Sequence, residues 1–188
     1  MLKKLLFWQP KKDYYHFLSN HSLGKNLLVS TNYLIWVFLF YVSYLLIKNQ
    51  TNIFWQLLIA TIASEVIEKI LKLKDYWKRP AFTNGNQVAR GLIKAWYTKG
   101  SFPSGHTIKA VFFLLFILQY PVISLPFFLL VIIPLLAIRV LIGFHYPIDV
   151  LGGIVFGIVI WFFARLISAP LWLNQITTSI FNLVFFIH

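Results

Sequence analysis

The sequence predicts an all-α integral membrane protein, folded as a single domain over residues 1–188 with five to six transmembrane helices. Hydrophobic residues make up 59% of the chain and charged residues 12%, whereas soluble domains carry about 25% charged residues. The apolar residues gather in stretches long enough to cross a bilayer, and short polar segments separate them.

The chain is strongly basic, with seventeen Lys and Arg against five Asp and Glu. A charge of this sign can favour nucleic acid, but here the cations stand between apolar spans. We therefore expect membrane lipids with anionic headgroups as partners, and no nucleic acid. The chain has no Cys, so disulfides and thiolate metal sites are excluded.

Residues 1–26 alternate basic and aromatic side chains, which favours an interfacial segment in the lipid headgroup region. A solvated tail is the alternative. The apolar spans follow at residues 27–47, 53–71, 104–120, 122–142 and 148–167. Residues 171–187 carry polar side chains on one side only, so a sixth span and an interfacial helix both remain open for them.

The second span is unusual because Glu65, Glu68 and Lys69 lie in its last two turns. Ionisable groups at such depth are rare and usually face the interior of a bundle. The pairs Glu65–Lys69 and Glu68–Lys72 are spaced i, i+4, which favours ion pairs along the helix surface. A direct catalytic role for either glutamate is the alternative, and Glu68 could also orient Lys72.

Residues 72–103 form the only long polar connection, and a loop of this length in a short chain is expected to be functional. Its charged and aromatic side chains include Asp75, Trp77, Arg90, Lys94, Trp96, Tyr97 and Lys99.

Three short polar clusters interrupt the apolar pattern. They are Lys72 with Arg79; Ser104 with Gly105 and His106; and Arg139 with His145 and Asp149. The first cluster follows the second span, the second cluster opens the third span, and the third cluster bridges the fourth and fifth spans. Counting the crossings places all three clusters on the same side of the membrane.

The second cluster is typical of a helix start, because Ser104 is a favoured N-cap and Gly105 lets a ligand approach the backbone. Free backbone N–H groups at such a start bind anions. A plain cap followed by a surface His106 is the simpler interpretation for this cluster taken alone.

The other two clusters supply cations and an imidazole. Arg79 and Arg139 can each bind phosphate oxygens through two N–H groups, and Lys72 is a compact charge; positive charge at a membrane edge is the plainer explanation for the first cluster. Asp149 falls in the first turn of the fifth span, where it can accept a hydrogen bond from the His145 ring and leave the other nitrogen nucleophilic. Asp149 could also act as a helix N-terminal anion paired with Arg139.

These motifs resemble the type 2 phosphatidic acid phosphatases, a family of membrane lipid phosphate phosphatases. The family signature is Lys-x6-Arg-Pro, then Pro-Ser-Gly-His, then Ser-Arg-x5-His-x3-Asp, and all three parts occur in order within residues 72–149. One position departs from it, because Ile138 stands where the family usually has a small or hydroxyl residue. That residue takes no part in the chemistry.

The resemblance implies a role for each residue of the clusters. By it, His145 forms a phosphohistidine, His106 protonates the leaving oxygen, and Asp149 supports His145. The phosphoryl oxygens are bound by Lys72, Arg79, Ser104, Gly105 and Arg139. Positioned cations then provide the electrostatic stabilisation that metal ions provide in kinases, so we expect an enzyme without metal or other cofactor.

Within the family, residues 101–107 and 143–152 look most like bacterial undecaprenyl-diphosphate phosphatases. Phosphatidylglycerophosphate, phosphatidic acid and lipid A phosphatases share the clusters and remain alternatives. A non-enzymatic anion or lipid transporter would show broken helices in two matching halves, which this sequence lacks. The related vanadate-dependent haloperoxidases are soluble, which this composition contradicts.

The membrane orientation is open to two opposing arguments. The side that carries the clusters also carries nearly all the Lys and Arg, so the positive-inside rule places it in the cytoplasm. However, cations needed for phosphate chemistry are poor indicators of topology. The resemblance implies a bacterial inner membrane protein with an extracytoplasmic active site, and we adopt that expectation.

Overall fold

The structure is a computed structural model, and it describes residues 2–9, 20–74, 76–83 and 100–185. The described part of the chain is helical and contains no strand. Its elements are α1 (Leu2–Leu6), α3 (Ser22–Asn49), α4 (Thr51–Leu73), the 3-10 turn η1 (Pro80–Phe82), α6 (Gly105–Gln119), α7 (Leu125–Leu141), α8 (Pro147–Ala164) and α9 (Leu171–Phe185). The predicted all-α fold is therefore confirmed.

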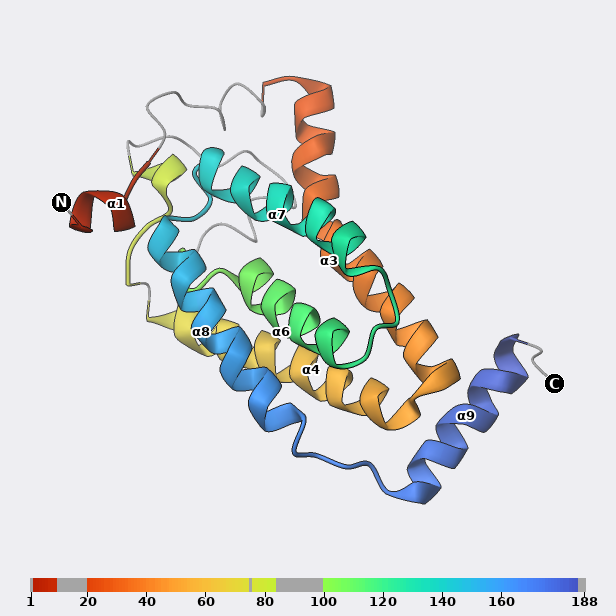
Figure 1. The fold of residues 1–188 in the computed structure, drawn as a ribbon. Coiled ribbons are helices and arrows are strands. Elements are labelled where there is room, and N and C mark those ends of the chain that lie inside the picture. Colours follow the sequence, from red (N-terminus) through yellow and green to blue (C-terminus); the bar gives the residue numbers. More distant parts are fainter. Residues whose placement is uncertain (1, 10–19, 75, 84–99, 186–188) are drawn as a thin grey trace.

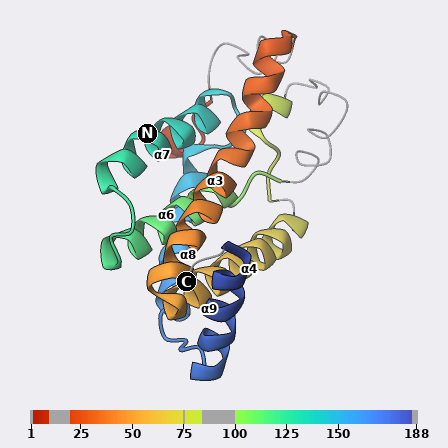
Figure 2. The same ribbon diagram turned by 90° about the vertical axis from the view of Figure 1, so that its right-hand side faces the viewer.

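Helix α6 lies at the centre of the bundle, where it contacts α3, α4, α7 and α8 (Figure 1). Its phenylalanines Phe112, Phe113 and Phe116 are buried among these neighbours. The view turned by 90° shows α3 and α4 crossing the same central helix (Figure 2). A charged side chain on α6 therefore has protein rather than lipid around it.

The most extensive contact in the bundle joins α6 to α8, and two glycines make it possible. A Cβ atom at Gly153 would lie 2.6 Å from the Cβ of Thr107, and one at Gly157 would lie 2.7 Å from the Cβ of Val111. Small residues four apart let the backbones of membrane helices approach closely. The start of α8, with Asp149, is thereby held against the start of α6, with Ser104.

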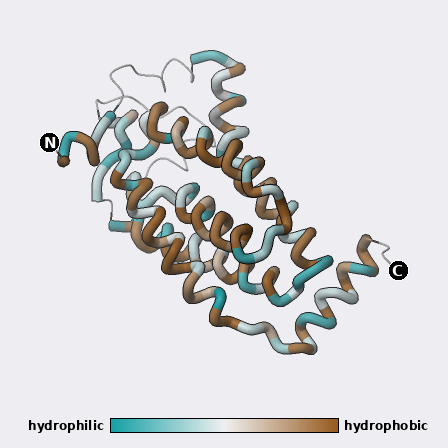
Figure 3. The backbone as a smooth tube through the Cα atoms, in the orientation of Figure 1, coloured by the Kyte–Doolittle hydropathy of each residue, from teal (hydrophilic) through white to brown (hydrophobic). Residues whose placement is uncertain are grey.

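Among the described helices, two are long and apolar enough to cross a membrane. By these two criteria α3 and α8 could each cross a bilayer, and α6 and α7 are shorter apolar helices. Figure 3 shows hydrophobic residues along α7 and α8. The helices coincide with the expected spans to within a few residues, except that α3 begins at Ser22, inside the predicted interfacial segment.

The remaining expectations concern the N-terminal interfacial segment and the C-terminal residues 171–187. Residues 10–19 of the predicted interfacial segment lie outside the described residues, and α1 packs near α8. Helix α9 packs against α3 and α4, with Phe181 buried beside Tyr44 and a hydrogen bond of 3.0 Å between the hydroxyls of Thr51 and Thr178.

Candidate active site

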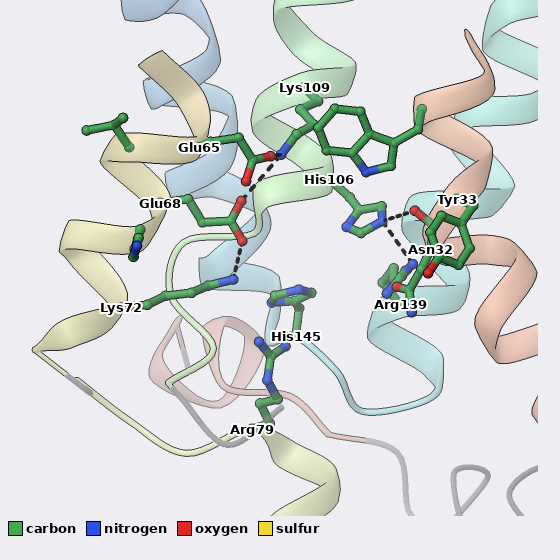
Figure 4. A pocket seen from close by; sticks show the side chains of 13 residues that line it. Asn32, Tyr33, Glu65, Glu68, Lys72, Arg79, His106, Lys109, Arg139 and His145 are labelled. Carbon is green, nitrogen blue, oxygen red and sulfur yellow. Dashed lines mark hydrogen bonds and ion pairs between the residues drawn. The ribbon is translucent and has the colours of Figure 1, made fainter. Parts of the chain in front are cut away.

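A cavity of about 680 Å³ lies between α3, α4, α6 and the loop that joins α7 to α8 (Figure 4). Five residues of the three predicted clusters line it: Lys72, Arg79, His106, Arg139 and His145. The other three, Ser104, Gly105 and Asp149, are buried and belong to the helix starts beside it. The structure therefore brings together residues that are up to 77 positions apart in the sequence, from Lys72 to Asp149.

Arg79 reaches the cavity because two loops are joined by backbone hydrogen bonds. The N–H of Ala81 in η1 donates to the carbonyl of Gly143 at 2.9 Å, and Gly143 has a φ of 83°, which favours glycine. The Arg79 side chain is 3% exposed, and its Nη1 donates to the carbonyl of Phe144 at 3.0 Å. This places its guanidinium beside His145.

Ser104 is the N-cap of α6, as predicted. Its Oγ accepts from the backbone N–H of Thr107 at 3.4 Å and from the Thr107 hydroxyl at 3.0 Å. The N–H of Ser104 in turn donates to the backbone carbonyl of Asp149 at 3.0 Å. The second and third clusters are thus joined directly through their backbones.

His106 and Arg139 lie next to each other in the wall of the cavity (Figure 4). An Nη2 N–H of Arg139 donates to His106 Nε2 at 3.0 Å. His106 Nε2 also lies 3.4 Å from the backbone oxygen of Asn32. Because a guanidinium can only donate, the bond from Arg139 requires an unprotonated Nε2. If Nε2 carried a proton, its N–H would instead donate a hydrogen bond to the Asn32 backbone oxygen.

Asp149 is fully buried at the start of α8, where it caps the helix. Its Oδ2 accepts from the Tyr146 backbone N–H at 2.7 Å, and its Oδ1 accepts from the Trp77 indole N–H at 3.0 Å. The Nδ1 atom of His145 lies 3.5 Å from Oδ2. The expected approach of the carboxylate to the His145 ring is present, at a distance longer than a normal hydrogen bond.

The environment of His145 keeps its imidazole neutral. Burial lowers the pKa of His145 well below its ordinary value of 6.5, and the positive charges of Arg79, Lys72 and Arg139 lower it further. With Nδ1 turned toward Asp149, Nε2 is the ring atom left for a ligand. A neutral ring in a cationic site can act as a nucleophile at physiological pH.

The acidic residues of α4 differ in part from the sequence prediction. Lys72 and Glu68 form the predicted ion pair. Glu65, however, pairs with Lys109 of α6 at 2.6 Å. The prediction that Lys69 is the partner of Glu65 is therefore wrong. The reason is that α6 packs against this face of α4 and presents a buried cation, which a solvated lysine on the same helix cannot match.

Lys109 is a charged residue of the cavity that the sequence analysis did not single out. Its side chain is 8% exposed, it lies 3.4 Å from Glu68 Oε2, and its Nζ is 5.5 Å from the centroid of the Trp36 ring. The signal was present, because Lys109 stands one turn after His106 in an otherwise apolar helix. Such an isolated intramembrane charge marks a functional position by default.

Most of the polar connection at residues 72–103 falls outside the part of the chain that the structure describes. Asp75, Arg90, Lys94, Trp96, Tyr97 and Lys99 all lie outside the described residues. Trp77 is described, and it contacts Asp149.

A comparison with protein families agrees with this arrangement. The profile of the PAP2 superfamily matches residues 53–172, which is more than half of the chain and contains all three clusters. Neither the curated proteins nor the solved structures gave a significant match. The chain therefore belongs to the PAP2 superfamily, and this membership implies phosphatase activity on lipid phosphates.

Proposed function

We propose that this protein removes the terminal phosphate of a membrane lipid through a phosphohistidine on His145, with undecaprenyl diphosphate as the preferred substrate and undecaprenyl phosphate as the product. The observation that carries the proposal is the convergence of two histidines and three motif cations on one cavity. The apolar helices around that cavity suit a substrate whose tail remains in the bilayer.

Phosphate binding rests on positive charge in a largely dry site. Arg79 and Arg139 are almost fully buried, so their attraction to a phosphate is weakly screened. The N-terminal turn of α6, from Gly105 onward, adds backbone N–H groups. Together these groups neutralise the charge that develops on the phosphoryl oxygens during transfer.

The first chemical step joins His145 to phosphorus. The lone pair of His145 Nε2 forms the N–P bond, and the bond from phosphorus to the leaving oxygen breaks with its electron pair. Asp149, near Nδ1, stabilises the positive charge that the ring acquires. A proton from His106 converts the leaving oxygen to a hydroxyl.

His106 can supply that proton once Arg139 has moved onto the phosphate. In the structure Arg139 donates to His106 Nε2, which requires the unprotonated nitrogen. A phosphate oxygen is a stronger acceptor for a guanidinium than a neutral imidazole. Substrate binding therefore frees Nε2 to carry a proton toward the leaving group.

The second step hydrolyses the phosphoenzyme. Water attacks phosphorus, the N–P bond breaks, and its electron pair returns to His145 Nε2. A proton from the water passes to His106, which restores the acid for the next cycle. Inorganic phosphate then leaves the cavity.

The proposed location is a bacterial inner membrane with the cavity on the extracytoplasmic side. The ends of α4 and α7 and the starts of α6 and α8 lie together near α1 (Figure 1), so the site belongs to one side of the bundle. The lipid tail would enter between the helices from the bilayer.

The test is phosphate release by the purified protein from undecaprenyl diphosphate, phosphatidylglycerophosphate, phosphatidic acid and lipid A in detergent micelles. We expect the diphosphate to be the best substrate and His145→Ala to abolish turnover. His21→Ala is the matched control, because His21 is exposed and does not line the cavity. Turnover by His145→Ala would refute the mechanism, and preference for a monophosphate would refute the substrate.

A further inference from the structure

The carboxylate of Glu68 occupies the place where an anionic ligand of this site is expected. It forms an ion pair with Lys72 and lies 3.4 Å from the Nζ of Lys109, so it bridges the two lysines (Figure 4). A Cβ atom added to Gly105 would overlap the Glu68 carboxyl group. The carboxylate therefore rests against the first residue of α6, where the free backbone N–H groups are.

These contacts are those expected of a bound phosphate. Lys72 and Gly105 are two of the groups assigned above to phosphate, and here the Glu68 carboxylate pairs with Lys72 and lies against Gly105. The Glu68 side chain is 19% exposed and lines the cavity, so it has room to turn away. A phosphate can reach Lys72 and Gly105 only after it has done so.

We propose that Glu68 is a tethered competitor that fills the phosphate site when no substrate is bound, and that Lys109 becomes a further phosphate ligand when Glu68 is displaced. The proposal rests on the proposed function, because it concerns the same site. It adds a fourth cation to Lys72, Arg79 and Arg139.

The second half of the proposal follows from the position of Lys109. Its side chain is buried and lines the cavity one helical turn from His106. When Glu68 turns away, Lys109 remains paired with Glu65. The Glu65 side chain is 49% exposed, so solvent screens it and it neutralises the charge of Lys109 less completely. An incoming phosphate would then lie between Lys72 and Lys109, as the Glu68 carboxylate does now.

The opposite interpretation is that Glu68 orients Lys72 for the ligand. The two interpretations predict effects of opposite sign when the charge of Glu68 is removed. A competitor that is removed strengthens phosphate binding, whereas a positioning partner that is removed weakens it.

The experiment is isothermal titration of inorganic phosphate and of orthovanadate into the purified protein in detergent at pH 7.5. We expect Glu68→Gln to lower the Kd for both ions by roughly tenfold, since one charge-assisted contact no longer has to be broken. Glu65→Gln is the comparison on the same helix: it removes the same charge from the partner of Lys109 but leaves the Glu68 carboxylate on Lys72 and Gly105 in place. We expect a smaller change for it, below about twofold, because Glu65 is half exposed.

Lys109 is tested in the Glu65→Gln background, so that its removal does not leave the Glu65 carboxylate without its ion-pair partner. We expect Glu65→Gln/Lys109→Met to bind phosphate roughly five- to tenfold more weakly than Glu65→Gln alone. Binding by Glu68→Gln that is unchanged or weaker than wild type would overturn the competitor, and equal binding by the double and single variants would overturn Lys109 as a ligand.

The outcomes also separate this proposal from the proposed function. A wild-type protein that binds phosphate but releases none from any lipid overturns the proposed function alone. Phosphate binding that appears only in Glu68→Gln supports the competitor. A lack of binding in every variant, in a protein that still releases phosphate from a lipid, overturns the competitor alone.

Discussion

Replacing Trp77 with Phe should slow catalysis, because it removes a hydrogen bond to Asp149, the carboxylate beside the proposed nucleophile His145. The indole N–H of Trp77 donates to Asp149 Oδ1 at 3.0 Å, and the opposite oxygen of that carboxylate lies 3.5 Å from His145 Nδ1. Phe keeps a six-membered aromatic ring to pack against Phe7 and Phe102, and it loses the donor together with the pyrrole part of the indole; the control Trp55→Phe below loses the same part. Trp77 is thus a positioning residue that acts through Asp149.

The size of the effect follows from the burial of Asp149. Its side chain is fully buried, so water cannot replace the lost donor at Oδ1. A hydrogen bond to a charged group contributes about 1.5–3 kcal/mol, which corresponds to roughly 10- to 150-fold if all of it is lost in the transition state. The Tyr146 N–H still holds Oδ2 at 2.7 Å, so we expect the lower part of that range, about 10- to 30-fold in kcat.

The assay is phosphate release measured as kcat and KM separately, with the protein's melting temperature as a check on folding. The loss should fall on kcat, because Trp77 does not line the phosphate cavity. Trp55→Phe is the matched control, since the buried Trp55 N–H has no hydrogen-bond partner among the described residues. A kcat within twofold of wild type for Trp77→Phe would refute the positioning role.

The pH dependence of kcat/KM should place its acid limb below pH 6.5, because the attacking His145 must be neutral and its burial among cations lowers its pKa; a limb at or above 6.5 would contradict this. His106→Ala should reduce hydrolysis of poor leaving groups far more than hydrolysis of an activated aryl phosphate, and equal losses on both would exclude an acid role. EDTA should leave phosphate release unchanged, and a requirement for Mg²⁺ would refute the metal-free scheme. An impermeant thiol reagent applied to intact cells, with any outer membrane permeabilised, should label Lys74→Cys, which follows the cavity end of α4, and spare Asn49→Cys, which ends α3 just before the opposite end of α4. Both positions are exposed, and the reverse result would place the site in the cytoplasm.

The parts of the site that could be predicted are those set by local chemistry and by the order of the spans. Ser104 caps α6 because a hydroxyl before a helix has its N–H partners within three residues. The Glu68–Lys72 pair depends only on helix periodicity. Predicting that Arg79 lies near His145 needs one further step. Counting the membrane crossings shows that their two loops lie on the same side.

The contacts that could not be predicted depend on how helices rotate against one another. Glu65 has a lysine four residues away on its own helix, yet it pairs with Lys109, because that partner is set by the packing of α6 on α4. The bond from Trp77 to Asp149 joins residues 72 positions apart, and it exists only because the loop after α4 passes over the start of α8. Neither contact is marked by a characteristic residue spacing in the sequence.

The same packing explains why a carboxylate stands in a site built for anions. Five Lys and Arg side chains line this cavity, and their mutual repulsion raises the free energy of the folded state. Glu68 lowers that repulsion by bridging two of them, and a phosphate that replaces it repeats the same neutralisation with more charge. The carboxylate that offsets this repulsion is therefore the one that a substrate must outcompete. Glu68→Gln should change two measurements in opposite senses: isothermal titration should show tighter phosphate binding, and thermal denaturation without phosphate should show a lower melting temperature.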